Sequence, residues 1–185
     1  MPRIDDRILD AATDCLLAYG ADRVTLAEIA RRAGVSRPTI YRRWPDVRAV
    51  LATLLTRRIT DALDAVPGPG VGRAALVARI VALADRLRAD EVITTVLRTR
   101  PDLAMVYIAE RLGTSQQILV DAVAGDIELA QQDGSVRPGD PRRLAAMCLL
   151  ITQSAIQSAR MVEPILDAEA LDAELTRALD GYLKP

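Results

Sequence analysis

Arginine side chains gather in one short stretch of the chain, residues 27–46 with the sequence AEIARRAGVSRPTIYRRWPD, and just beyond it. A guanidinium group can bind a phosphate or a guanine edge through two hydrogen bonds at once, so such a cluster favours a nucleic-acid partner. An ordinary helical hairpin with a solvated, arginine-rich face would show the same density of arginines. The residues around the arginines are therefore needed to distinguish a nucleic-acid-binding motif from such a hairpin. The six arginines are Arg31, Arg32, Arg37, Arg42, Arg43 and Arg48.

The charge of the chain is divided unevenly along its length. Residues 1–58 contain 11 of the 24 basic residues and 7 of the 25 acidic ones, which gives this part a net charge of +4. The rest of the chain carries the remaining 13 basic and 18 acidic residues, a net charge of -5. A basic N-terminal part followed by an acidic remainder indicates that the N-terminal part binds a polyanion.

Other kinds of chemistry have little support in the sequence. The chain has no histidine, which removes the common base–nucleophile pairs, and no pair of carboxylates stands at a helpful spacing. Cys15 and Cys148 are far apart and belong to no CxxC motif, so no metal site is expected. The glycines of residues 67–72 follow no strand and lack the GxGxxG spacing, which indicates a linker. We therefore expect a protein that is not an enzyme and needs no cofactor.

Two features of the composition bear on where the protein works. The longest unbroken apolar run, residues 144–151, is too short to cross a bilayer. The charged opening MPRIDDRILD is unlike a secretory signal. We expect a soluble, cytoplasmic protein with no membrane partner and with both cysteines as buried thiols.

Apolar residues recur every three or four positions along the chain, which is the period of an α-helix, and no segment alternates as a strand would. The sequence therefore predicts an all-α fold with about nine helices. Their expected extents are about residues 4–19, 25–33, 36–44, 46–66, 73–88, 91–98, 101–132, 141–162 and 167–183.

The signals that surround the arginines predict a helix-turn-helix. Thr25 and Glu28 have the spacing of a capping box at a helix start, and Gly34 suits a tight turn between two helices. Ser36 can cap the next helix, with Pro38 in its first turn, where a missing N–H costs little. A helix of this kind fits the major groove with its N-terminal residues nearest the bases.

The segment from residue 8 to residue 46 resembles the N-terminal DNA-binding domain of the TetR family of bacterial repressors (TetR/AcrR type). The matching features are Ala11 and Ala12, Gly20, Thr25, Ile29 and Ala30, the run Ala33-Gly34-Val35-Ser36, Thr39, Tyr41 and an aromatic residue at Trp44. The close match spans about residues 8–55, and the rest of the chain resembles the family in length and helical content.

The resemblance implies two domains. Residues 1–46 would form a three-helix helix-turn-helix DNA-binding domain, and residues 47–185 a larger helical domain for ligand binding and dimerisation. The helix at 46–66 would link the two. The family also implies a homodimer, a ligand pocket in the larger domain, and release from DNA when that pocket fills.

Carried over position by position, the resemblance assigns DNA contacts to this chain. Residues at base-contacting places are Arg37, Pro38 and Tyr41. Residues expected at phosphates are Thr25, Ser36, Thr39, Arg42, Arg43 and Arg48. The chain departs from the family at Val47, where a lysine is common. Either Arg48 replaces this phosphate contact or the contact is absent.

The last two helices, about residues 141–162 and 167–183, carry apolar stripes and small residues that suit pairing with a second copy. Two helix-turn-helix units related by a twofold axis would read half-sites of a palindromic operator about 34 Å apart. The alternative is that the stripes complete the core of each monomer.

The effector site is the least defined part of the prediction. The region from 73 to 132 is apolar with scattered polar groups, which suits a hydrophobic cavity with a few hydrogen-bonding groups and suits a closed core equally well. The candidate pocket residues are Thr94, Arg98, Tyr107, Glu110 and Met147.

The sequence thus predicts a sequence-specific DNA-binding transcriptional regulator, a repressor released from its operator by an unidentified small molecule. The alternative is a ligand-binding or protein-binding member of the same fold that has lost operator binding.

Overall fold

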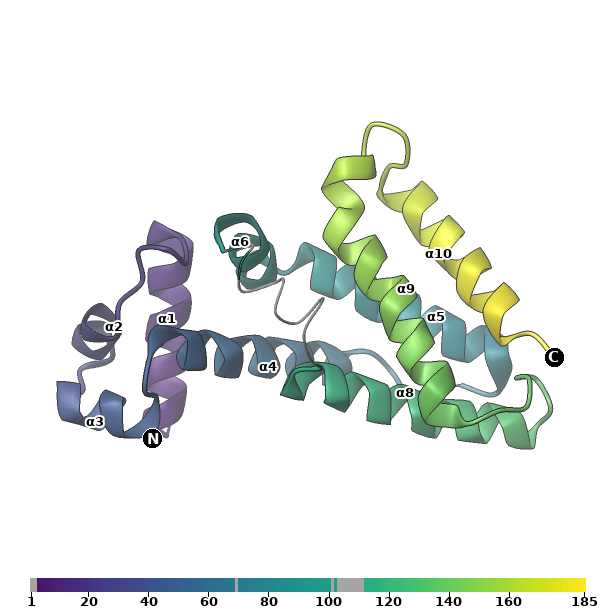
Figure 1. Ribbon diagram of the computed structural model, residues 1–185, viewed down its shortest axis with the longest axis horizontal. Helices are drawn as coiled ribbons and strands as arrows, with labels where there is room; N and C mark the ends of the chain where they lie inside the picture. Colours follow the sequence, from purple (N-terminus) through teal and green to yellow (C-terminus); the bar gives the residue numbers. More distant parts are fainter. Residues whose placement is uncertain (1–2, 69, 101, 103–111) are drawn as a thin grey trace. The chain divides into compact units, whose positions relative to one another are not determined.

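The computed structural model describes residues 3–68, 70–100, 102 and 112–185 of the chain (Figure 1). Over these residues the secondary structure is helical and includes no strand, so the predicted all-α class is confirmed. The described helices are α1 (Ile4–Tyr19), α2 (Leu26–Ala33), α3 (Arg37–Arg43), α4 (Val47–Ala65), α5 (Gly72–Ala89), α6 (Glu91–Thr99), α8 (Thr114–Gln132), α9 (Pro141–Val162) and α10 (Ala168–Leu183).

One expected helix is wrong in its extent. The sequence predicted a single helix over 101–132, but Leu112 and Gly113 are not helical and α8 begins at Thr114. Gly113 has an extended backbone, with φ -75° and ψ 169°, and its N–H donates to Oε1 of Gln116 at 2.8 Å. This side-chain bond satisfies a backbone group at the helix start, so a new helix begins there. Residues 101 and 103–111 of the expected helix lie outside the described residues.

The chain divides into two compact units. The first contains Met1–Ile59 and Asp90–Leu112, and the second contains Thr60–Ala89 and Gly113–Pro185. These limits differ from the expected boundary between residues 46 and 47, because the first part of α4 and the whole of α6 pack with the N-terminal helices. The assignment of a separate function to each part remains a prediction.

The first unit has a core built from the apolar sides of its helices. α1 packs against α2 and α6, and α2 packs against α3. The backbone N–H of Ala21 also donates to the hydroxyl of Thr99 at 3.0 Å, which joins the end of α6 to the turn after α1. The larger core residues include Ile8, Leu16, Ile29, Ile40, Trp44, Val50, Leu51, Leu54, Val92 and Val96.

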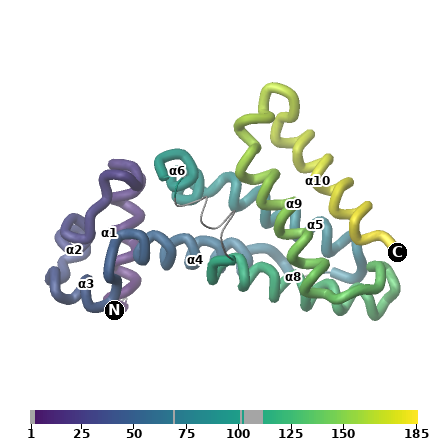
Figure 2. The backbone as a smooth tube through the Cα atoms, in the orientation of Figure 1, coloured from purple at the N-terminus to yellow at the C-terminus, as the bar shows by residue number. Residues whose placement is uncertain are grey.

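The second unit is a bundle in which α8 and α9 lie side by side and α10 packs against both α9 and α5 (Figure 2). Arginines of α5 tie the bundle together through ion pairs, Arg79 with Asp126 of α8 and Arg88 with Asp172 of α10. No helix among the described residues is long and apolar enough to cross a membrane.

Candidate nucleic-acid interface

The start of α2 forms half of the expected capping box. Oγ1 of Thr25 accepts a hydrogen bond from the backbone N–H of Glu28 at 3.2 Å. The carboxylate of Glu28 does not return the bond, because it binds Arg31 instead, with N···O distances of 2.7 and 2.9 Å. Hydrogen bonding to Arg31 lowers the pKa of Glu28. The box predicted from spacing is therefore wrong in its second half, although the cap itself is present.

The turn between α2 and α3 depends on a left-handed glycine. Gly34 has φ +64° and ψ 38°, a region that a residue with a Cβ rarely adopts. The backbone N–H of Val35 donates to the carbonyl of Ala30 at 3.0 Å, so the chain closes tightly over the end of α2. Ala30 itself is buried, which leaves room for the two helices to approach.

A second residue that fixes this turn was not apparent from the sequence. Nη2 of Arg7, on α1, donates to the carbonyl oxygen of Ala33 at 2.6 Å. A positive group at this place satisfies a free carbonyl at the C-terminus of α2 and favours the dipole of that helix. A Cβ added at Gly34 would lie 3.1 Å from the same nitrogen. Arg7 therefore holds the helix end that sets the direction of α3.

Helix α3 is short and is fixed at both ends. Oγ of Ser36 accepts from the backbone N–H of Thr39 at 3.3 Å, and the two hydroxyl groups lie 2.7 Å apart. At the other end Trp44 is buried, and its indole N–H donates to Oγ1 of Thr53 on α4 at 2.9 Å. With Ile40 fully buried between these points, the opposite side of α3 has to face outward.

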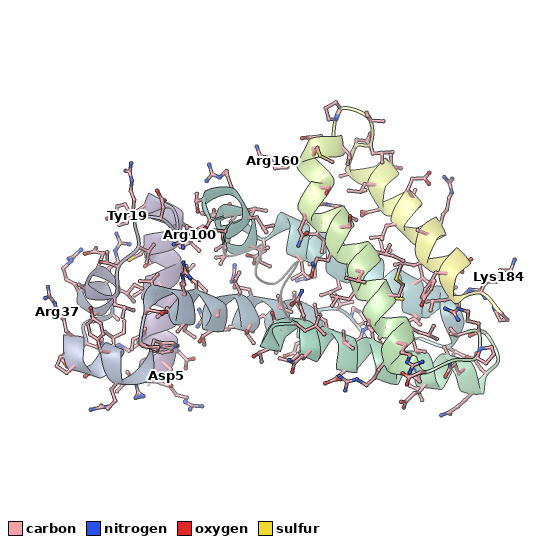
Figure 3. The ribbon with its side chains drawn as sticks, viewed as in Figure 1. Asp5, Tyr19, Arg37, Arg100, Arg160 and Lys184 are labelled. Carbon is pink, nitrogen blue, oxygen red and sulfur yellow. The ribbon has the colours of Figure 1, made fainter. Side chains whose placement is uncertain are left out.

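The outward side of α3 carries the residues expected to touch DNA. Figure 3 shows Arg37 projecting away from the helices of its unit. Tyr41 is 54% exposed, a large value for an aromatic side chain in a folded protein. Neither Arg37 nor Arg42 forms an ion pair with the residues that the structure describes. The exposed predicted residues are Thr25, Ser36, Arg37, Pro38, Tyr41, Arg42, Arg43 and Arg48, and Thr39 is partly buried.

The six arginines of the cluster separate into two groups. Arg31 and Arg32 lie on α2, where both pair with Glu28, and Arg32 also donates to the hydroxyl of Tyr19 at 3.1 Å. These two side chains are thus occupied within the unit. The remaining four, on α3 and at the start of α4, belong to the candidate interface.

Arg43 has an acidic neighbour that the sequence did not suggest. Its Nε lies 3.1 Å from Oδ1 of Asp5 on α1, and both side chains are about one third to two fifths exposed, 34% and 41%. The contact at Nε leaves the two terminal nitrogens of the guanidinium group for another acceptor. The structure therefore leaves room for Arg43 to bind a phosphate while Asp5 holds it.

The start of α4 shows how the chain differs from the family at Val47. Val47 is partly buried and packs against the core of its unit, so it is not available to a phosphate. Arg48, one position later, is exposed and lies 3.9 Å from Asp102. Asp102 in turn receives two hydrogen bonds from Arg100, both 2.8 Å long.

The expected pocket residues that the structure describes belong to different units, so a shared pocket remains a prediction. Thr94 and Arg98 lie one turn apart on α6 in the first unit, and the hydroxyl of Thr94 donates to the carbonyl of Asp90 at 3.0 Å. Met147 belongs to the second unit and is exposed on α9, so it suits a surface better than the wall of a cavity. Tyr107 and Glu110 lie outside the described residues.

Comparison with known sequences agrees with this geometry. Residues 8–54 match the family described as "Bacterial regulatory proteins, tetR family". An uncharacterized HTH-type transcriptional regulator of Mycobacterium tuberculosis strain H37Rv is 61% identical over 177 residues, which cover 96% of this chain and 93% of that protein. The regulator YdeS of Bacillus subtilis strain 168 is 33% identical over 156 residues, 84% of this chain and 66% of that protein.

Solved structures share the fold at low identity. The repressor QsdR of R. erythropolis, from the TetR family, gives a TM-score of 0.69 at 17% identity and covers 98% of this chain and 96% of its own. FadR from Bacillus subtilis, solved in complex with stearoyl-CoA, gives 0.66 at 18% identity, with 96% and 98% covered. The flavonoid-responsive regulator FrrA gives 0.63 at 21% identity, with 97% and 95% covered.

The helix-turn-helix geometry, the matched segment and the relatives along nearly the whole chain agree with one another. The chain belongs to the TetR family of bacterial regulatory proteins, and it is a DNA-binding transcriptional regulator.

Proposed function

We propose that the exposed side of α3 enters the major groove of an operator and that the protein acts as a repressor. The observation that supports this most directly is the division of α3 into two sides, one of which buries Ile40 while the other exposes Arg37 and Tyr41. A helix can read base edges when its anchoring side chains and its polar side chains lie on opposite sides.

Within this interface the residues have different roles. Arg37 and Tyr41 meet base edges, and Pro38 offers an apolar contact to a thymine methyl group. The phosphates on either side are held by Thr25, Ser36, Thr39, Arg42, Arg43 and Arg48. Arg48 takes the phosphate contact that Val47, turned toward the core, does not make.

The repressor binds its operator as a homodimer paired through α9 and α10. Exposed apolar residues recur on α9 at Met147, Leu150 and Met161, and these positions share one side of the helix because they are three and eleven residues apart. Exposure of such an apolar stripe to water is unfavourable, and packing against a second copy of the chain would bury the stripe. A twofold dimer also explains how a short helix reads a long site, since each copy reads one half.

A small molecule controls the release from DNA. The structural neighbour FadR was solved in complex with stearoyl-CoA and the neighbour FrrA is flavonoid-responsive, which supports effector control in a helical body of this fold. The bundle of α5, α8, α9 and α10 in the second unit is the part of the chain in which we place the effector.

A second candidate function is a protein of this fold that has lost operator binding. The observation in its favour is that Arg43 and Arg48 lie near the carboxylates of Asp5 and Asp102, while Val47 is turned inward. Under this alternative, binding to duplex DNA would be weak and would depend little on salt.

The test is footprinting on the DNA directly upstream of the coding region of this protein, because regulators of this shape often act there. We expect a protected near-palindrome with two half-sites about one helical turn apart. Absence of protection at low salt, with a protein that is folded by circular dichroism, would favour the second candidate.

A further inference from the structure

One hydroxyl group in the second unit is buried and lacks a partner. Thr152, on α9, is 9% exposed, and its Oγ1 has no hydrogen bond among the residues that the structure describes. Other helical threonines of this chain donate to the carbonyl four residues earlier, as Thr13, Thr99 and Thr176 do. Thr152 does not use this bond, so its hydroxyl is left for another acceptor.

The residue next to Thr152 offers a second donor. Nε2 of Gln116, on α8, donates to Oε1 of Gln153, while Oε1 of Gln116 accepts from the N–H of Gly113. The amide oxygen of Gln153 is therefore used, and its NH₂ group makes no hydrogen bond with the described part of the chain. Two consecutive residues of α9 thus present an O–H and an N–H that have no acceptor within the part of the chain that the structure describes.

The surroundings of the Thr152 hydroxyl are apolar. Cys148, one turn before Thr152, is 1% exposed, and burial raises the pKa of its thiol to about 11. Ile156, one turn after, packs against the same core. A polar group of a ligand that enters this buried region loses its hydrogen bonds with water and needs hydrogen bonds with the protein in their place.

The most buried cations of this unit already have carboxylate partners, although Nε of Arg79 has no hydrogen bond among the described residues. Arg79 binds Asp126 of α8, and Arg88 binds Asp85 and Asp172. A buried ligand anion would need a cation of its own, because an uncompensated charge in the interior is strongly unfavourable. The donors of Thr152 and Gln153 therefore suit a neutral oxygen better than a carboxylate.

We propose that Thr152 and Gln153 bind a carbonyl oxygen of the effector, and that the effector is an uncharged, mainly apolar ketone, lactone or ester. This inference rests on the proposed function, because it specifies the small molecule that would release the protein from DNA. The carbonyl accepts the O–H of Thr152 and an N–H of Gln153, and the apolar remainder packs among the aliphatic side chains of the bundle.

The test uses the full chain and isothermal titration calorimetry. The probes are 2-decanone and γ-decalactone, with decanoate and decylammonium as charged molecules of matched length. We expect the neutral probes to bind at least about tenfold more tightly than either charged one, and Thr152→Val to weaken their binding by about tenfold. Thr152→Ser, which keeps the hydroxyl, should retain binding. The control is Thr176→Val, whose hydroxyl bonds its own helix, and it should bind as the wild type does.

A stability measurement separates ligand binding from a structural role. Since the hydroxyl of Thr152 has no partner without ligand, Thr152→Val should unfold at the same temperature as the wild type or a higher one. A lower unfolding temperature would show a structural partner and would overturn the proposal. So would failure of both neutral probes to bind, tighter binding of decanoate, or unchanged binding to Thr152→Val.

Binding to the footprinted duplex without any probe distinguishes this inference from the proposed function. Duplex binding without probe binding overturns the effector class alone. Probe binding without duplex binding overturns operator control and leaves the carbonyl site in place.

Discussion

The indole N–H of Trp44 and the hydroxyl of Thr53 are joined by a hydrogen bond of 2.9 Å that ties the end of α3 to α4. The hydroxyl of Thr53 in turn donates to the carbonyl oxygen of Ala49 at 2.9 Å, so it both accepts and donates a hydrogen bond. Trp44 is buried, and its N–H would otherwise be left without a partner. This bond helps to hold α3 in the orientation that keeps its arginines outward.

Removal of the Thr53 hydroxyl should therefore destabilise the first unit. Thr53→Val keeps the shape of the side chain but removes the acceptor of the Trp44 N–H, which should lower the free energy of unfolding by about 0.5–1.5 kcal/mol. Urea unfolding followed by tryptophan fluorescence measures it. Thr13→Val is the control, because that hydroxyl bonds only its own helix, at Leu9. Equal losses in the two variants would show that the Trp44 bond adds nothing.

The turn glycine gives a second prediction. Gly34→Ala places a Cβ on a backbone with φ +64° and 3.1 Å from Arg7, so we expect a loss of about 1–2 kcal/mol in the free energy of unfolding. Gly125→Ala is the matched change, because Gly125 lies within α8 with nothing within 4 Å of its added Cβ. It should stabilise the protein by about 0.5–1 kcal/mol. The same sign for both substitutions would contradict the role assigned to Gly34.

Local signals were enough to predict the helix-turn-helix. Ser36, Pro38 and Gly34 act on their own backbone or on residues within one turn, so their meaning can be read from spacing. The helix predicted after Ser36 was expected to present Arg37 to DNA, and the structure exposes Arg37 and buries Ile40 on the other side of α3. The exposure of the candidate DNA-binding residues could therefore be predicted, while their contacts with DNA remain a prediction.

Contacts between distant parts of the chain could not be predicted in this way. Arg7 donates to the carbonyl of Ala33, and Asp5 pairs with Arg43. Both contacts depend on how the turns between the helices are folded, which residue spacing alone does not determine. The break before α8 was missed for a related reason. A glycine inside a helical pattern is often tolerated, so Gly113 did not predict a helix boundary. In the structure the side chain of Gln116 accepts from the N–H of Gly113, and a new helix begins at the next residue.

Cys148 provides a prediction on pH dependence. Burial raises the pKa of its thiol from 9.0 to about 11 in the folded protein. The unfolded chain loses this proton near pH 9 and the folded chain retains it, so the stability from the neutral thiol is complete below pH 9. It is lost as the pH rises toward 11, by up to about 2–3 kcal/mol.

Comparison of the wild type with Cys148→Ala isolates this effect from other groups that titrate above pH 9. Urea unfolding between pH 8 and pH 11 should show a steeper fall of stability for the wild type. Cys15 is present in both proteins, so its own raised pKa cancels in the difference. Parallel curves would show that the Cys148 thiol titrates normally in the folded state.

Arg37 should determine preference at one base pair. Arg37→Ala is expected to weaken binding to the footprinted operator by roughly 1–3 kcal/mol and to relax the preference at a single position, because a bidentate contact to guanine is lost. Competition assays with operators substituted at each position measure both effects. Uniform weakening on all sequences would instead make Arg37 a phosphate contact.

The most direct test of the central claim is the salt dependence of duplex binding, measured by fluorescence anisotropy on the footprinted DNA. Each phosphate contact adds about 0.9 to the slope of log K against log salt, so the double variant Arg42→Ala with Arg43→Ala should flatten the slope by about two units per half-site. The charge-matched double variant Arg86→Ala with Arg142→Ala, on α5 and α9, should leave it unchanged. Equal slopes for wild type and both variants would contradict a DNA-binding role for the exposed arginines of α3.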